Sequence, residues 1–282
     1  MNKNEVNNVA FQGQSGAYSE MACKEFLPSM NTLPCENFED AFDAVNQGSA
    51  KYAMIPIENS RAGRVADIHN LLRDSSLHIV NEYFYRVNHQ LLGLEGAKIE
   101  DIVSVFSHVQ ALSQCRNFIS QNRLSPIVMG DTAGSAAYIA KNNEKKHAAI
   151  ASSLAGEIHG LKVLSNNIQD SRDNVTRFVV LSSESADPDP NDGLILTSCI
   201  FSLRNIPAAL YKALGGFATN RVNIVKLESY ILDESFTSAQ FYIDIYGHPS
   251  DKPVRLALEE LGFFSKEVRI LGVYKGAKER EV

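Results

Sequence analysis

Several features that mark specialised protein classes are missing from this 282-residue chain. It contains no uninterrupted run of about 18 apolar residues, so no segment is predicted to cross a membrane. Its first residues, Met1 to Glu5, are polar and precede no apolar segment, so we expect no secretion signal and a cytoplasmic location. A positive charge excess is also lacking, because 27 Lys and Arg oppose 33 Asp and Glu for a net charge of −6. We therefore expect neither a membrane nor a nucleic acid as a partner.

Metal and nucleotide motifs are absent as well. The four cysteines, Cys23, Cys35, Cys115 and Cys199, lie far apart and include no C-x-x-C pair. Zinc sites and disulfide frameworks need clustered cysteines, so we predict four small, buried thiols in a reducing compartment. The seven histidines include no H-E-x-x-H pair, and no G-x-G-x-x-G or Walker A sequence occurs. We assign no metal site.

What remains is the composition of a globular protein, with 44% hydrophobic and 21% charged residues and a length typical of about two domains. One segment separates two parts of the chain. Ser182 to Gly193 has two prolines and no large apolar residue, so it cannot bury enough surface to fold. We predict a first domain at 1–185, a linker at 186–193, a second domain at 194–275 and a tail at 276–282.

The second domain shows a clear order of elements. Helical spacing of apolar residues marks one helix at Leu210 to Phe217 and another at Val254 to Leu261. Alternation of apolar and polar residues predicts a half-buried strand at Ala239 to Tyr246. Further strands are predicted at 194–203, 223–232 and 267–274. The resulting order is βαββαβ, the ferredoxin-like arrangement, which by itself names no function.

The first domain alternates short strands, polar turns and helices, which predicts an α/β fold with a mostly parallel sheet. The strands are expected at 9–11, 52–57, 103–106, 127–129 and 147–151. In such a sheet the turns gather at the carboxyl ends of the strands, where ligands bind, and helix N-termini favour an anion. The same Ser, Thr, Asp and Asn side chains could instead only cap their helices. These turns are Ser15-Gly16, Asn59-Ser60, Ser107-His108, Asp131-Thr132 and Ser152-Ser153.

The motifs of the first domain resemble those of prephenate dehydratases, and those of the second resemble an ACT regulatory domain. Each motif alone is weak, but they follow the family's order along essentially the whole chain. In the first domain they are Gly13-Gln14-Ser15-Gly16-Ala17-Tyr18-Ser19, Pro56-Ile57-Glu58-Asn59-Ser60, Ser107-His108-Val109-Gln110-Ala111-Leu112, Asp131-Thr132-Ala133 and Asn174-Val175-Thr176-Arg177-Phe178. In the second they are Asn205-Ile206-Pro207-Ala208-Ala209-Leu210, Asn223 and Lys226-Leu227-Glu228-Ser229.

The resemblance implies a catalytic region folded like a two-lobed periplasmic binding protein. Crossover strands near 80–92 and 176–181 would join the lobes, and the substrate would lie in the cleft between them. The implied reaction converts prephenate to phenylpyruvate with loss of water and carbon dioxide, a step of phenylalanine biosynthesis. Decarboxylation supplies the electrons and aromatisation the driving force, so no cofactor is expected.

The resemblance also implies roles for individual residues. Thr176 would donate a hydrogen bond to the ring hydroxyl as the C–O bond breaks. Arg177 would either hold a carboxylate or form a structural ion pair. His108 could act as a general acid or as a helix cap, and Glu58 could belong to a proton relay or be a buried structural carboxylate. The implied substrate-binding residues are Asn59, Ser60, Ser107, Gln110, Thr132, Arg177 and Phe178.

The ACT resemblance implies control by an amino acid, expected to be phenylalanine, bound where two such domains meet in a homodimer or homotetramer. The chain departs from the family's pattern at Ala208, where the family has glycine, and at Tyr230-Ile231, where it has Arg-Pro. A side chain in place of glycine crowds the approach of backbone to a ligand. The implied effector-binding residues are Ala208, Ala209, Leu210, Asn223, Glu228 and Ser229.

Two other functions remain open at the sequence level: an arogenate dehydratase, which performs the same chemistry on the amino-acid analogue, and a non-enzymatic amino-acid-sensing binding protein. The Thr176-Arg177-Phe178 motif argues against the second. No chorismate mutase segment is expected, because no helical segment precedes Val9. Removal of the residues after about Asp192 is expected to leave an active, unregulated enzyme.

Overall fold

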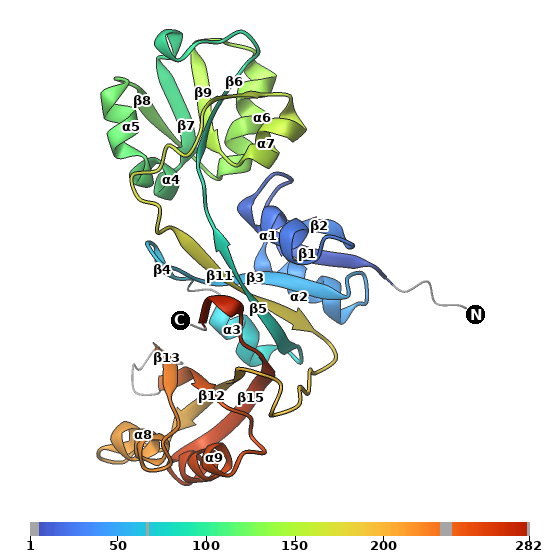
Figure 1. Cartoon of the computed structure of the whole chain (residues 1–282), viewed down its shortest axis with the longest axis vertical. Coiled ribbons are helices and arrows are strands. Elements are labelled where there is room, and N and C mark those ends of the chain that lie inside the picture. Colours follow the sequence, from blue (N-terminus) through green and yellow to red (C-terminus); the bar gives the residue numbers. More distant parts are fainter. Residues whose placement is uncertain (1–5, 66–67, 232–238, 281–282) are drawn as a thin grey trace, which may run out of the picture. The chain divides into compact units, whose positions relative to one another are not determined.

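The computed structural model describes residues 6–65, 68–231 and 239–280 (Figure 1). The chain forms two compact units, and neither is continuous in sequence. The first comprises Met1–Val65 and Tyr83–Phe178, and the second comprises Ala66–Glu82 and Val179–Val282. The second unit therefore combines the C-terminal part of the chain with a short internal segment.

The first unit contains the amino-terminal sheet, which has the strand order β2-β1-β3-β11-β5, with the short β4 paired to β3. β1 is parallel to both β2 and β3. The ranges of β5 and β11 run on into the second unit. The strands are β1 (Asn8–Gln12), β2 (Asn31–Cys35), β3 (Tyr52–Asn59), β4 (Gly63–Arg64), β5 (His78–Arg86) and β11 (Val175–Ser182), and the helices are α1 (Tyr18–Phe26) and α2 (Phe38–Asn46).

A five-stranded sheet with the order β10-β6-β9-β7-β8 completes the first unit. β7 is parallel to β8 and β9, whereas β6 is antiparallel to β9 and β10. The predicted α/β alternation is confirmed, although both sheets are mixed. The strands are β6 (Gln90–Gly93), β7 (Ser104–His108), β8 (Ser125–Met129), β9 (His147–Ala151) and β10 (Lys162–Ser165), and the helices are α4 (Val109–Gln114), α5 (Arg116–Gln121), α6 (Thr132–Asn142) and α7 (Ser153–His159), with a 3-10 turn at Ile99–Asp101.

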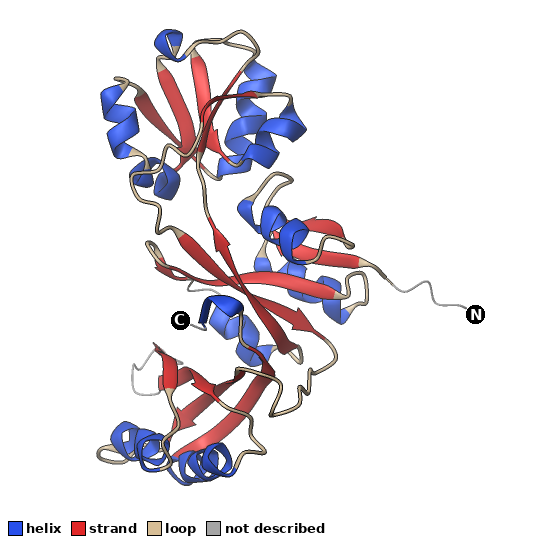
Figure 2. Cartoon of the chain, in the orientation of Figure 1, coloured by secondary structure: helices blue, strands red, loops and turns tan. Residues whose placement is uncertain are grey.

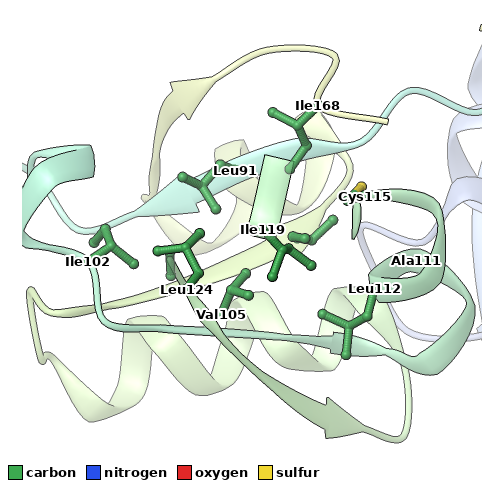
Figure 3. Packing of buried hydrophobic residues seen from close by; sticks show 11 residues of the cluster. Leu91, Ile102, Val105, Ala111, Leu112, Cys115, Ile119, Leu124 and Ile168 are labelled. Atoms are coloured by element: carbon green, nitrogen blue, oxygen red, sulfur yellow. The ribbon is translucent and has the colours of Figure 1, made fainter. Parts of the chain in front are cut away.

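Figure 3 shows the core on one face of this sheet, where Leu112, Cys115 and Ile119 pack against Leu91 and Val105. Leu112, Cys115 and Ile119 stand at i, i+3 and i+7, a spacing that predicts one face of a helix, and all three are buried. The helix is nevertheless broken, because Cys115 leaves the helical conformation at φ −120° and ψ 23° and separates α4 from α5.

The second unit has the predicted βαββαβ order, and its four strands form an antiparallel sheet in the order β13-β14-β12-β15. α8 and α9 pack on one face of this sheet (Figure 2), over Cys199, Phe201 and Ile243. Leu232, the last residue of one predicted strand, lies outside the described residues. The elements are α3 (Ile68–Asp74), β12 (Ile195–Leu203), α8 (Ala209–Thr219), β13 (Ile224–Ile231), β14 (Ala239–Tyr246), α9 (Lys252–Phe264) and β15 (Ser265–Lys275), with a 3-10 turn at Lys278–Arg280.

The prediction that β14 is half-buried is wrong. Tyr242 and Asp244, on the face expected to meet solvent, are both fully buried. The reason is that α3 covers this second face of the sheet. The sequence patterns did not predict this helix. The His69 ring stacks on Tyr230 at 4.1 Å between centroids and meets the edge of Tyr242 at 5.5 Å.

Further contacts hold the same internal segment to the sheet. The Arg269 guanidinium donates to the carbonyl oxygens of Arg73 and Ser75, at 2.7 and 2.5 Å. The Arg280 Nε donates to the buried Glu82 carboxylate at 2.5 Å.

None of the described helices is long and apolar enough to cross a bilayer.

Candidate functional site

Asn59, the last residue of β3, is the hub of the candidate site. Its Oδ1 accepts the backbone N–H groups of Arg61 and Ala62, at 2.9 and 2.8 Å. Its Nδ2 donates to Asn174 Oδ1 and to Thr176 Oγ1, both at 2.9 Å. The carboxamide of Asn59 therefore uses both hydrogens and its oxygen, and the chain turn after β3 fixes its orientation.

Ser60 joins this turn to the start of β11 through hydrogen bonds. Its hydroxyl donates to the carbonyl of Asp173 at 2.5 Å and accepts the N–H of Val175 at 3.0 Å. The backbone N–H of Ser60 donates to the carbonyl of Val175 at 2.9 Å. Two motifs that are more than a hundred residues apart in sequence thus share one hydrogen-bonded cluster.

A cavity of about 340 Å³ lies beside this cluster in the first unit. Asn174 is one of its walls, and Gln110 is the predicted substrate-binding residue that lines it directly. Its polar lining includes one guanidinium, that of Arg61, which also donates to Ser171 Oγ. The lining residues are Arg61, Ala62, Gln110, Ser113, Gln114, Asp170, Ser171 and Asn174.

Arg61 and Gln114 are the lining residues that matter most for anion binding and that the sequence reading did not single out. Arg61 directly follows the Asn59-Ser60 motif, so its position after a ligand-facing turn was an available signal. Gln114 lies one turn after Gln110 on α4, which places both on the same helix face. The guanidinium and the amides around a cavity of this size suit a small carboxylate ligand. The Asp170 carboxylate also belongs to the lining, where its Oδ1 accepts the N–H of Asn117 at 3.0 Å.

Behind the cavity wall, the polar cluster continues into the protein. Asn174 Nδ2 donates to Gln114 Oε1 at 2.6 Å, and His89 Nε2 lies 2.9 Å from the same oxygen. The Tyr18 hydroxyl lies 2.6 Å from His89 Nδ1. Burial lowers the pKa of His89, a shift partly opposed by its bond to Gln114, and burial raises the pKa of Tyr18 well above its ordinary value. Both rings are therefore neutral at neutral pH.

Thr132 belongs to a different part of the first unit. It begins α6, whose cap Asp131 accepts the N–H of Gly134 at 2.6 Å. Asp131 lines a second cavity of about 530 Å³. The other residues around that cavity are Gln12, Gly13, Gln14, Ser15, Pro34, Cys35 and Glu36, which include part of the first predicted motif.

Three of the four remaining predicted residues of the first unit are buried. Ser107 is fully buried, and its hydroxyl donates to the carbonyl of Ile150 at 2.6 Å. Arg177 and Phe178 are buried in β11. His108 caps α4, because its ring accepts the N–H of Gln110 at 3.3 Å, as the capping alternative predicts. None of these four residues lines either cavity, and neither do Asn59, Ser60, Thr132 and Thr176.

In the second unit, the predicted effector-binding residues lie at two ends of the sheet. Ala208 to Leu210 form the start of α8, and Glu228 and Ser229 lie in β13, where Glu228 accepts a hydrogen bond from Lys226 at 3.1 Å. Asn223 precedes β13 beside Tyr246, at the opposite end of the strand from Ile231. Ala208 adopts a left-handed conformation, with φ 59° and ψ 27°, at the position where the family has glycine.

The part of the chain that the structure describes contains no group of three or more His, Cys, Asp or Glu side chains able to hold a metal ion. Cys23, Cys115 and Cys199 are buried and unpaired, and Cys35 is half-buried. Burial raises the pKa of Cys115 and of Cys199 to about 12, so neither thiol is an activated nucleophile at neutral pH.

Comparison with protein families and known proteins gives consistent results. The family model described as prephenate dehydratase matches residues 9–186. A protein of Komagataeibacter europaeus named bifunctional N-acyl-homoserine lactone acylase/prephenate dehydratase is 46% identical over 267 residues, which cover 94% of this chain and 95% of the relative. Arogenate dehydratase/prephenate dehydratase 2 of Arabidopsis thaliana is 40% identical over 275 residues, covering 94% of this chain and 72% of the relative.

Among solved structures, prephenate dehydratase from Arthrobacter aurescens in complex with L-Phe matches with a TM-score of 0.86 and 30% sequence identity. The match covers 95% of this chain and 89% of the Arthrobacter chain, so it includes both units.

Proposed function

Because the chain belongs to the prephenate dehydratase family, we propose that it is a lyase that converts prephenate to phenylpyruvate, carbon dioxide and water. The observation that carries the proposal is the state of the Thr176 hydroxyl. Its oxygen accepts a hydrogen bond from Asn59 at 2.9 Å, and its hydrogen has no acceptor among the described residues. Thr176 is thus prepared to donate a hydrogen bond to a ligand.

The proposed reaction needs such a donor. The bond between the ring and its carboxylate breaks, and the electron pair enters the ring while the bond to the ring hydroxyl breaks. The hydroxyl leaves with its bonding electron pair and takes up one proton, supplied in net by the solvent, to become water. Hydroxide is a poor leaving group, so a hydrogen bond from Thr176 that strengthens as the C–O bond lengthens lowers the barrier. Decarboxylation supplies the electrons, and the proposal therefore needs no cofactor.

Binding of the dianionic substrate must overcome the chain's net charge of −6. Arg61 is the cation of the cavity lining, and we assign it one substrate carboxylate, which a guanidinium can hold through two hydrogen bonds. Gln110, which lines the cavity, keeps its proposed place beside the substrate, whereas the side chains of Asn59 and Ser60 hold the turn after β3 to the start of β11. For Arg177, which is buried, the proposed role is to fix β11 beside Thr176.

The test is a turnover assay on the purified chain with prephenate and with arogenate as separate substrates. We expect phenylpyruvate from prephenate, followed by its absorbance in alkali. Product from arogenate alone would select the arogenate dehydratase named among the plant relatives. Turnover of neither substrate, with calorimetric binding of an amino acid, would select a binding protein instead.

The near full-length similarity to the Komagataeibacter relative supports a second candidate activity, because that protein is also named an N-acyl-homoserine lactone acylase. Its test is release of homoserine lactone from an N-acyl-homoserine lactone by the same protein preparation. Since burial raises the pKa of the Cys115 and Cys199 thiols, we expect any such activity to use a hydroxyl group or water rather than these two thiols.

The proposal extends to regulation by phenylalanine through the C-terminal βαββαβ part, acting as an ACT domain in a homodimer or homotetramer. Its support is the order β13-β14-β12-β15 and the similarity over both units to an Arthrobacter protein whose structure is named as a complex with L-Phe. Phenylalanine should change kcat or KM, and light scattering should give the mass of two or four chains. A monomer whose kinetics ignore phenylalanine would contradict this part of the proposal.

A further inference from the structure

In the hydrogen bonds behind the cavity, which atom donates and which accepts can be assigned step by step, starting from two backbone N–H groups. Asn59 Oδ1 accepts two backbone N–H groups, which have no reversed form, so Asn59 must present its NH₂ group to Asn174 and Thr176. Asn174 therefore accepts through Oδ1 and donates through Nδ2. Gln114 must in turn present its oxygen to Asn174.

The direction extends to the buried ring of His89. Gln114 Oε1 is an acceptor, so His89 carries its proton on Nε2, and its Nδ1 accepts from the Tyr18 hydroxyl. This contact, at 2.6 Å, is shorter than the 3.2 Å from the same hydroxyl to the carbonyl oxygen of Asn88. Two donors converge on Gln114 Oε1, and two bonds diverge from Asn59 Nδ2. Amide groups do not titrate. A series of hydrogen bonds in which two donors meet at one acceptor cannot move a proton from His89 to Thr176. The cluster holds groups in place and fixes which of their atoms remain to be used.

Two donors are left over in this cluster: Gln114 lines the cavity, and Thr176, which does not line it, is joined through Asn59 to Asn174 in the cavity wall. Thr176 Oγ1 accepts from Asn59 and keeps its own hydrogen for a ligand. Gln114 lines the cavity, its oxygen holds both Asn174 and His89, and its NH₂ group has no acceptor among the described residues.

We infer that Asn59, Asn174 and His89 are positioning residues that leave Thr176 and Gln114 as hydrogen-bond donors, Thr176 to the leaving hydroxyl and Gln114 to a substrate carboxylate. The inference rests on the proposed function and adds Gln114 as a substrate-binding residue. The alternative tautomer of His89, with its proton on Nδ1, would turn Gln114 around and aim two NH₂ groups at each other between Gln114 and Asn174.

The first test changes the hydrogen bonds of Asn59, the residue from which the other directions follow. In the Asn59→Asp variant, the aspartate still accepts hydrogen bonds from the backbone N–H groups of Arg61 and Ala62. Its ionised carboxylate cannot donate to Thr176, and the Thr176 hydroxyl then donates its hydrogen to the carboxylate. We expect kcat to fall about 10²-fold, as for loss of one catalytic donor. Activity of this variant should recover as the pH falls and the new carboxyl group gains a hydrogen, whereas wild-type activity should not. Asn122→Asp, the same substitution outside the cavity, is the matched control.

The second test separates binding from chemistry at Gln114. Gln114→Glu keeps an acceptor for Asn174 and His89 but replaces the NH₂ donor with a negative oxygen, so KM should rise about tenfold or more while kcat changes far less. Gln114→Met removes the acceptor and the donor together, so both constants should worsen. An unchanged KM in Gln114→Glu, or a kcat and pH profile of Asn59→Asp equal to those of wild type, would overturn the inference.

The third test needs no turnover. Nitrogen-15 NMR of the wild-type chain should show His89 as the neutral tautomer with its proton on Nε2, and a proton on Nδ1 would overturn the inference. Because this result stands apart from activity, a chain with the expected tautomer and no turnover of prephenate or arogenate would contradict the proposed function alone.

Discussion

At the residue scale, the candidate site depends on short-range hydrogen bonds whose donors and acceptors are settled. Asn59 joins two motifs that are distant in sequence, and Ser60 holds the same two segments together through backbone groups. Thr176 is thereby presented as a donor. The sequence motifs identify these residues, but the link between them is a tertiary contact.

Thr176→Ala is expected to lower kcat about 10²-fold with prephenate, because the leaving hydroxyl loses its positioned donor. KM should change little, and the free energy of unfolding should fall by about 1 kcal/mol, since only the bond from Asn59 is lost. Steady-state kinetics and urea unfolding check both values. Turnover close to that of wild type would show that another group serves the leaving hydroxyl.

Ala208→Gly is expected to stabilise the second unit by about 1 kcal/mol, because Ala208 has φ 59° and an L-residue with a Cβ is strained there. Denaturant unfolding of the full chain measures the change. Ala209→Gly, at the first residue of α8 where φ is not positive, is the matched control and should destabilise the protein.

At the element scale, the start of α1 is held by a buried carboxylate. Glu20 Oε2 accepts the N–H of Gly16 at 2.6 Å, and Oε1 accepts from Thr32 at 2.9 Å and pairs with Lys24 at 3.1 Å. Gly16 is required in this turn, because a Cβ there would lie 2.7 Å from the Cα of Ala155. The turn thus joins α1 to the start of α7, where Ser152 donates to the carbonyl of Gly16.

The charge on Glu20 makes this junction sensitive to acid. Burial works to raise the pKa of Glu20, but the bonds from Gly16, Lys24 and Thr32 outweigh it, and the pKa lies below the unfolded value of 4.5. The stabilisation is therefore complete above about pH 4.5 and is lost as the pH falls through the lowered pKa.

Glu20→Gln should accordingly destabilise the protein by about 1–3 kcal/mol at pH 7, the range for a hydrogen bond to a charged group. The difference from wild type should shrink as the pH falls from 5 to 3. Thermal unfolding across this range is the measurement, and a difference that does not depend on pH would contradict the assignment.

At the scale of the whole molecule, the internal segment 66–82 belongs with the C-terminal part of the chain. Ile68, Leu72 and Ile79 are buried in the second unit. The close packing extends to the backbone, because a Cβ on Gly272 would lie 2.0 Å from the carbonyl oxygen of Ile79. The predicted linker at 186–193 therefore does not coincide with the boundary between the two compact units.

This packing changes the expectation for truncation after Asp192. Removal of the C-terminal sheet would expose the apolar face of α3 and the start of β5, and would leave the Glu82 carboxylate without Arg280. We expect the 1–192 fragment to aggregate or to unfold at a lower temperature than the full chain, rather than to be a simple unregulated enzyme. Circular dichroism and light scattering of the fragment test this, and a monodisperse fragment as stable as the full chain would contradict it.

Local sequence patterns alone predicted most of the elements. The βαββαβ order and the apolar faces of α8 and α9 follow from residue spacing, because helix and strand periodicities are local properties. Ordered motifs also predicted the family of the chain. The same local patterns missed α3, the break at Cys115 and the burial of both faces of β14, all of which depend on what packs against each segment.

The sequence by itself thus determined most of the elements, the family and the candidate catalytic threonine. Only the tertiary structure decided that Asn59 bonds to Thr176, that Arg61 and Gln114 line the adjacent cavity, and that α3 covers the C-terminal sheet. The physical reason is the range of the interactions. Periodicity and capping act within a few residues, whereas hydrogen-bond direction and the burial of a second face arise between segments more than a hundred residues apart.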